Sequence, residues 1–125
     1  MKILLVDDDV LLTRILSHRL RQDAHEVHLA RNGGEATRAL EKLRPDLVLL
    51  DYNLPGNPGP RVCEQMRKQR FGAAVPIFIL TVRNKLRDIE TAFHAGATDY
   101  IYKTSSCDEL AAIIHRKYER SRSGR

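Results

Sequence analysis

Residues 47–50, Leu-Val-Leu-Leu, form an apolar run without polar alternation that ends in Asp51 and leads into a Pro/Gly-rich loop at 55–60. A strand that is apolar on both sides is expected to be covered on both faces, as strands are in the parallel sheets of α/β proteins. Ligands of such sheets bind beyond the carboxyl ends of the strands. We therefore expect a buried strand that delivers the Asp51 carboxylate, as the reactive group, to a binding site.

Further apolar runs alternate with amphipathic segments along the chain. The predicted strands lie at 2–6, 26–30, 47–51, 75–80 and 98–102, and a helical pattern of apolar residues follows each of them. The run 26–30 carries polar positions, which places it at a sheet edge. This alternation predicts a doubly wound α/β domain with five helices and a parallel sheet in the strand order 2-1-3-4-5.

A chain of 125 residues with 42% hydrophobic composition has room for one domain with a core. We place the domain at residues 1–119, and interpret 120–125 as a basic tail or the start of a linker. No apolar run approaches the about 18 residues of a membrane span, so a soluble, cytoplasmic protein without membrane contact is expected. Cys63 and Cys107 lack metal-like spacing and are expected as free thiols.

The formal charge of +5 is concentrated at the end of the chain. Residues 115–125 hold five basic side chains and one acidic side chain, a net +4 that leaves +1 for the remainder. A solvated tail explains this distribution better than a phosphate-binding patch does, so we expect no direct nucleic acid binding by this domain.

Three carboxylates are expected to converge at one edge of the sheet. Asp7 and Asp8 follow the first strand, which is the neighbour of the Asp51 strand in the predicted order. Two like charges about 4 Å apart repel by about 4 kcal/mol at an effective dielectric constant of 20, so such a cluster binds either protons or a cation. Its hard oxygen ligands suit Mg²⁺ or Mn²⁺. A solvated strand end is the simpler explanation for Asp7 or Asp8 taken alone.

Two further side chains fall at carboxyl ends of predicted strands. Thr81 closes the fourth strand and Lys103 closes the fifth, so a hydroxyl group and a cation reach the edge that holds the carboxylates. Together these groups are typical of phosphoryl transfer. Asp51 is then the nucleophile, the metal and Lys103 neutralise charge on the transferring group, and the Thr81 hydroxyl binds one of its oxygens.

With these residues in place, the sequence resembles the receiver domains of two-component response regulators. The resemblance covers residues 1 to about 119 and rests on the segments 3–9, 51–56, 79–81 and 95–103, one at each of four strand ends. It implies a flavodoxin-like three-layer sandwich. It also implies a signalling switch that catalyses only its own phosphorylation and dephosphorylation, and hence is not an enzyme with turnover.

The resemblance implies specific roles at the phosphorylation site. Asp51 is similar to the residue that accepts a phosphoryl group from a sensor histidine kinase or a phosphotransfer protein. Asp8 is similar to a direct metal ligand, Asp7 to a largely water-mediated one, and Asn53 to the residue that adds its backbone carbonyl.

It also implies how the signal leaves the site. Thr81 and Tyr100 match a switch pair, in which the hydroxyl moves toward the phosphoryl group and the aromatic ring follows inward, although packing in the core explains Tyr100 equally well. The output is expected on the face made by the fourth helix, fifth strand and fifth helix, with a downstream output domain or effector, or a phosphorylation-dependent homodimer, as the partner.

Two positions affect the lifetime of the phosphorylated state in this resemblance. Asn53 and Arg83 each lie two residues beyond a site residue, where receivers place a gate on the hydrolytic water. We expect Arg83 to shield the phosphoryl group.

The sequence departs from the receiver pattern in two places. Thr104 follows Lys103 where receivers usually have a proline after a cis peptide, so this loop is either trans and reshaped or strained, at a cost of about 3 kcal/mol for a non-proline cis bond. The loop 57–60, Asn-Pro-Gly-Pro, is rich in Pro and Gly where receivers commonly have an acidic residue before the glycine.

Three alternative functions remain to be weighed. A pseudo-receiver that acts by phosphorylation-independent protein contact is favoured only by Thr104. A haloacid-dehalogenase-like phosphatase is disfavoured by Asn53, which stands where an acid is needed, and by the lack of room for a substrate cap. Flavin binding requires a phosphate-cradling loop after the first strand, where three aspartates stand instead.

Overall fold

The computed structural model describes residues 1–103 and 106–123 of the chain. Five parallel strands form one sheet in the order β2-β1-β3-β4-β5, which confirms the predicted topology and the edge position of β2. The strands are β1 (Lys2–Val6), β2 (Glu26–Ala30), β3 (Leu47–Asp51), β4 (Ile77–Thr81) and β5 (Asp99–Tyr102). The fourth and fifth strands begin two residues and one residue later, respectively, than the sequence predicts.

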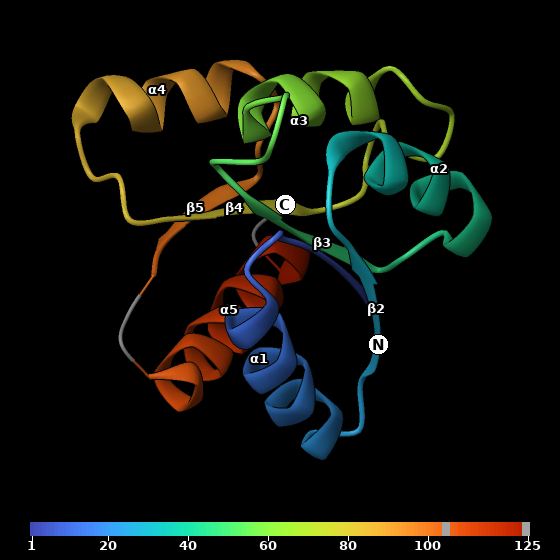
Figure 1. The fold of residues 1–125 in the computed structure, drawn as a ribbon, viewed down its shortest axis with the longest axis vertical. Coiled ribbons are helices and arrows are strands. Elements are labelled where there is room, and N and C mark those ends of the chain that lie inside the picture. Colours follow the sequence, from blue (N-terminus) through green and yellow to red (C-terminus); the bar gives the residue numbers. More distant parts are fainter. Residues whose placement is uncertain (104–105, 124–125) are drawn as a thin grey trace.

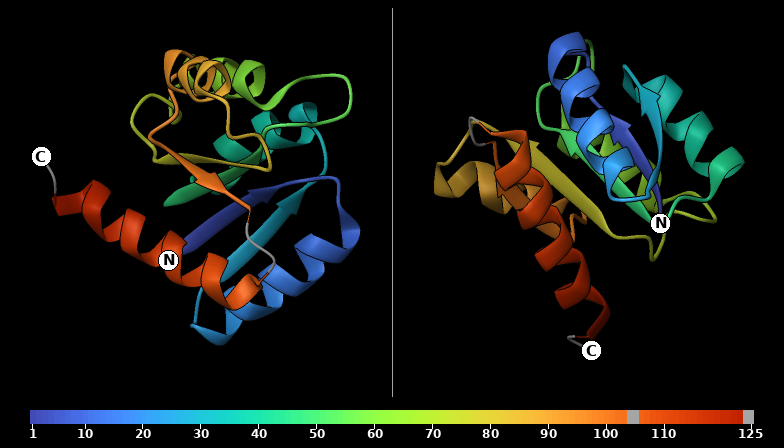
Figure 2. Two further views of the ribbon diagram at one scale, coloured as in Figure 1. Left: turned by 90° about the vertical axis from the view of Figure 1, so that its left-hand side faces the viewer. Right: turned by 90° about the horizontal axis from the view of Figure 1, so that it is seen from below.

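The helices cover both faces of the sheet, as the doubly wound prediction requires. One face carries α1 (Val10–Gln22) and α5 (Cys107–Ser123), which lie side by side (Figures 1 and 2). The other face carries α2 (Gly33–Leu43), α3 (Gly59–Arg67) and α4 (Leu86–His94). The molecule is therefore a three-layer α/β/α sandwich.

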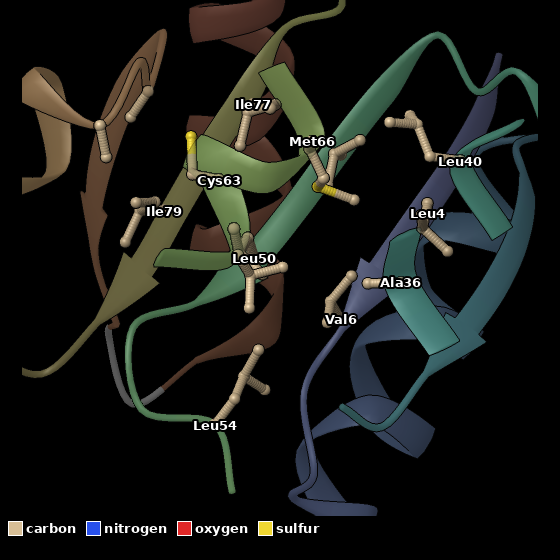
Figure 3. Packing of buried hydrophobic residues seen from close by; sticks show 14 of the residues in the cluster. Leu4, Val6, Ala36, Leu40, Leu50, Leu54, Cys63, Met66, Ile77 and Ile79 are labelled. Atoms are coloured by element: carbon tan, nitrogen blue, oxygen red, sulfur yellow. The ribbon is translucent and has the colours of Figure 1, made fainter. Parts of the chain in front are cut away.

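Alternate residues of the central strands enter two separate cores. In β1 and β3, Leu4 and Leu50 face α2 and α3 (Figure 3), whereas Leu5 and Leu49 face α1 and α5. All four side chains are fully buried. Because both faces of these strands are covered, the sequence of β3 shows no polar alternation.

Local signals in the sequence fix where several helices begin and end. The Asp9 carboxylate caps α1 by accepting from Leu12 N–H at 3.0 Å, and Asn32 caps α2 by accepting from Glu35 N–H at 2.9 Å. Gly96 follows α4 with φ of +105°, a conformation that favours glycine. Each of these three residues therefore marks one end of a helix.

The inward face of α1 holds Leu16 and Leu20, as the apolar spacing indicates, together with two hydroxyl side chains. Leu11 and Ile15 are exposed, at 67% and 47%, whereas Thr13 and Ser17 are buried. At the end of the chain, residues 120–123 continue α5 as helix up to Ser123. No helix within the described residues is long and apolar enough to cross a membrane.

Candidate functional site

The carboxyl ends of β1, β3 and β5 bring three charged side chains into contact. The strands are in register, so that Val6 pairs with Leu50, and Asp51 with Leu80. The Lys103 ammonium group lies 3.1 Å from Asp7 Oδ2 and 3.0 Å from Asp51 Oδ1. The structure thus joins residues that are 44 to 96 positions apart in the sequence, although Thr104, the departure noted beside Lys103, lies outside the described residues.

Both carboxylates in this contact are buried, Asp7 with 2% and Asp51 with 6% exposure. Burial raises the pKa of Asp51, and the charge of Asp7 raises it further, while Lys103 and the Asn53 N–H group act in the opposite direction. Burial alone lowers the pKa of Lys103, but the carboxylates of Asp51 and Asp7 outweigh it, so that this pKa is raised. The lysine therefore stays charged and neutralises part of the acidic site.

Asp8 joins the same cluster from an exposed position. Carboxylate oxygens of Asp7, Asp8 and Asp51 all lie within 4.8 Å of one another. Hard oxygen donors at this spacing fit a divalent cation such as Mg²⁺. The Oδ1 atom of Asp7, which is not the oxygen that contacts Lys103, accepts from Asp9 N–H at 3.0 Å. This bond fixes the orientation of the Asp7 side chain.

The loop after Asp51 folds back on the end of β3. Gly59 N–H donates to Tyr52 O at 2.6 Å, and Asn53 forms an isolated antiparallel bridge with Pro58. A Cβ atom at Gly59 would lie 2.3 Å from the Asp51 carbonyl oxygen, so only glycine allows this approach. Pro60 stands in the first turn of α3, where its missing N–H group is not needed.

Thr81 and Tyr100 meet at the backbone of Arg83. Thr81 is buried, and its Oγ1 accepts from Arg83 N–H at 2.9 Å. The Tyr100 hydroxyl donates to Arg83 O, while its ring packs partly buried against the core under α2, α3 and α4. Burial raises the pKa of Tyr100, so that this hydroxyl keeps its proton. The predicted switch pair is thus connected through one residue.

The Arg83 side chain extends between the loop after β3 and α4. Its Nε lies 3.4 Å from Asn53 Oδ1, its guanidinium carbon lies 4.9 Å from the centre of the Tyr52 ring, and its Nη1 lies 3.5 Å from Asp88 Oδ1. Arg83 also lines a groove of about 630 Å³ between this loop and α4. Sequence reasoning gave no role to Tyr52, although it directly follows Asp51, and it missed Asp88, because nothing in the pattern relates that residue to the strand ends.

Comparisons with known proteins give a consistent result. The response regulator receiver domain family matches residues 3–115. The DNA-binding response regulator MtrA of Mycolicibacterium paratuberculosis is 38% identical over 120 residues, which are 96% of this chain and 52% of that protein. The chain therefore spans about half the length of this relative.

Solved structures show the same fold. The BeF3-activated N-terminal receiver domain of Klebsiella pneumoniae RstA superposes with a TM-score of 0.83 at 30% identity, covering 94% of this chain and 98% of that one. The receiver domain of the Pseudomonas aeruginosa sensor histidine kinase PA1611, which holds a magnesium ion in its active site cleft, superposes with a TM-score of 0.83 at 33% identity over 94% and 97% of the two chains.

Proposed function

Because the chain belongs to the response regulator receiver domain family, we propose that it is the phosphorylation-dependent switch of a two-component system, with Asp51 as phosphoacceptor. The observation that carries this proposal is the contact of the Lys103 ammonium group with Asp51 Oδ1 and Asp7 Oδ2 at the strand ends. A buried carboxylate, a cation and a second acid lie together in this contact, which supports Asp51 as the nucleophile. The proposed phosphoryl donor is a phosphohistidine of a sensor kinase or of a phosphotransfer protein.

In the proposed reaction, one carboxylate oxygen of Asp51 attacks the phosphorus atom. A P–O bond forms, the P–N bond to the donor imidazole breaks, and its electron pair stays on the imidazole nitrogen. Before the reaction, Lys103 donates to Asp51 Oδ1. During the reaction, one of its three N–H donors turns to a phosphoryl oxygen. The Thr81 hydroxyl binds another oxygen, because its bond from Arg83 N–H occupies a lone pair and not the O–H proton.

Asp7, Asp8, Asp51 and the backbone carbonyl of Asn53 are the groups that we expect to hold Mg²⁺ or Mn²⁺. Three of them offer carboxylate oxygens within 4.8 Å of one another. When bound, the ion supplies charge neutralisation for the transferring phosphoryl group. The magnesium ion in the related PA1611 receiver domain supports this assignment.

The proposed switch runs from Thr81 through Arg83 to Tyr100. When the Thr81 side chain moves toward a phosphoryl group, its oxygen, which accepts from Arg83 N–H at 2.9 Å, draws the backbone of Arg83 with it. The Tyr100 hydroxyl donates a hydrogen bond to the carbonyl of Arg83. The Tyr100 ring therefore moves when the Arg83 backbone moves. The α4–β5–α5 face then changes and presents the signal to an output domain, an effector or a second copy of the chain.

The test is intact mass after incubation with Mg²⁺ and acetyl phosphate, measured on the wild type and on Asp51→Asn. We expect one phosphoryl group on the wild type, its loss when Mg²⁺ is removed with EDTA, and none on the variant. Asp46→Asn, a change of an exposed acid just before the same strand, is the matched control and should be phosphorylated. If no protein is modified although circular dichroism shows the fold intact, the pseudo-receiver alternative replaces this proposal.

A further inference from the structure

Asp88 is a buried carboxylate outside the phosphorylation site. It lies in the first turn of α4 and is 8% exposed. Ionised carboxylates are rarely buried without a partner, since desolvation of the charge is costly. The partner of Asp88 within the described residues is Arg83, whose Nη1 lies 3.5 Å from Asp88 Oδ1.

The Arg83 side chain also contacts the loop beside Asp51. The Nε of Arg83 contacts Asn53 Oδ1, and Asn53 follows the proposed phosphoacceptor Asp51 by two residues. The backbone N–H of Arg83 donates a hydrogen bond to Thr81 Oγ1. The guanidinium group therefore lies between the loop beside Asp51 on one side and α4 on the other. The pairing with Asp88 holds it on the α4 side.

We propose that Asp88 is a positioning residue that competes with the phosphoryl group of phosphorylated Asp51 for the Arg83 guanidinium. This inference rests on the proposed function. A phosphoryl group carries close to two negative charges, and the planar fork of arginine binds its oxygens in bidentate fashion. The Arg83 guanidinium therefore binds either the buried Asp88 carboxylate on α4 or the more highly charged phosphoryl group on Asp51.

The competition has consequences in both directions because coupling between two sites is reciprocal. Asp88 draws Arg83 away from the acyl phosphate, which leaves the phosphorus atom open to water and shortens its lifetime. When the phosphoryl group takes Arg83, the Asp88 carboxylate loses its partner, and the first turn of α4 must adjust to expose it. Phosphorylation is thereby communicated to α4 by a route separate from Tyr100.

A simpler role for Asp88 is the stabilisation of α4, because an acid in the first turn interacts favourably with the helix dipole. That role predicts a lower melting temperature for Asp88→Asn and an unchanged dephosphorylation rate. The competition predicts a changed rate that depends on the presence of Arg83. The dephosphorylation rate of Asp88→Asn, measured with Arg83 present and with Arg83 replaced by alanine, distinguishes the two roles.

The experiment measures the lifetime of the acyl phosphate after acetyl phosphate is removed, in the wild type, Asp88→Asn, Arg83→Ala and the double variant. We expect Asp88→Asn to lengthen the lifetime about fivefold or more, and to have no effect when Arg83 is already alanine. Glu90→Gln, which neutralises an exposed acid of the same helix, is the control and should match the wild type. Asp88→Ser replaces Asp88→Asn if the latter does not fold.

Two results overturn the inference while the proposed function stands: an unchanged lifetime in the neutral Asp88 variant, or an equal lengthening with and without Arg83. A wild type that accepts no phosphoryl group at all overturns both the proposed function and the inference. The two failures are therefore distinguishable in one series of samples.

Discussion

At the scale of single residues, the ionised side chain of Asp51, the proposed phosphoacceptor, lowers the stability of the fold. Asp51 is almost fully buried beside Asp7, and both burial and this neighbour raise its pKa. A carboxylic acid whose pKa is higher in the folded than in the unfolded protein stabilises the fold only while it is protonated. Its contribution is lost as the pH rises from the unfolded value of about 3.8 through the higher folded value.

We therefore predict that Asp51→Asn is more stable than the wild type at pH 7.5 without metal, by about 1 kcal/mol or a few degrees in melting temperature. The amide removes the buried charge, and Lys103 keeps its contact with Asp7. Thermal unfolding in EDTA at pH 7.5 and at pH 4 measures this, and the difference should shrink at the lower pH. A less stable variant at pH 7.5 would show that the Lys103 contact outweighs burial.

The residues of the site could be predicted where one geometric rule applied. Parallel strands end at a common edge, so the positions of Asp7, Asp51 and Lys103 followed from the strand pattern alone, and the structure brings them into contact. Asp88 could not be found in this way. Its burial depends on the packing of α4 and on the path of the Arg83 side chain, which no spacing in the sequence encodes.

At the scale of elements, hydrophobicity identified α1 as a helix and placed Leu16 and Leu20 on its buried side, but it missed the two hydroxyl residues beside them. Thr13 and Ser17 are buried because their hydroxyl groups donate to Val10 O and Arg14 O of the same helix at 3.1 and 3.2 Å. A hydroxyl group satisfied within its own helix can be buried at little cost. An apolarity count ranks such residues as exposed, so it missed these two positions of the buried side.

The contact between α5 and the turn before β2 is made by two imidazole rings. His25 Nε2 lies 2.7 Å from His115 Nε2, and His25 Nδ1 lies 3.0 Å from the Met1 nitrogen. One Nε2 must donate its proton and the other must accept it, so protonation of the accepting Nε2 would place two N–H groups face to face. Burial, the Met1 amino group and His115 all lower the pKa of His25.

A histidine whose pKa is lower in the folded protein contributes stability above its unfolded pKa of about 6.5, which is lost as the pH falls through the folded value. We predict that acidification from pH 7.5 to 5.5 lowers the melting temperature less in His25→Gln than in the wild type, by about one or two degrees for this partly exposed site. His18→Gln, an exposed histidine of α1, is the control. An identical pH response in wild type and His25→Gln would contradict the expectation.

At the scale of the whole molecule, four exposed apolar side chains lie on α4, on β5 and on the segment after β4. Leu86 is 71% exposed, and Val82, Phe93 and Tyr102 are also exposed. These residues belong to α4, to β5 and to the segment after β4, within the face on which we expect the output. We expect these exposed apolar residues to take part in a protein contact on that face.

We predict that phosphorylation shifts the chain from monomer toward dimer through this face. Leu86→Glu should lower the dimer fraction at least about tenfold, since two buried charges are brought together, while phosphorylation of Asp51 continues. Leu29→Glu, on β2 at the opposite edge of the sheet, is the matched control. Light scattering with and without acetyl phosphate measures the effect, and dimerisation of phosphorylated Leu86→Glu would place the contact elsewhere.

The length of α5 gives the molecule a mechanical property. Its buried residues, Leu110, Ala111 and Ile114, all belong to the first half, whereas the helix runs on through Ser123. Seventeen residues at about 1.5 Å each make a rod of about 25 Å, so that a tilt of about 5° at its packed end displaces the far end by about 2 Å. Tyr118 still packs against the core, so we expect the turn beyond it to move farthest when the helix tilts and to pass a small rearrangement beside β5 to any surface that touches it.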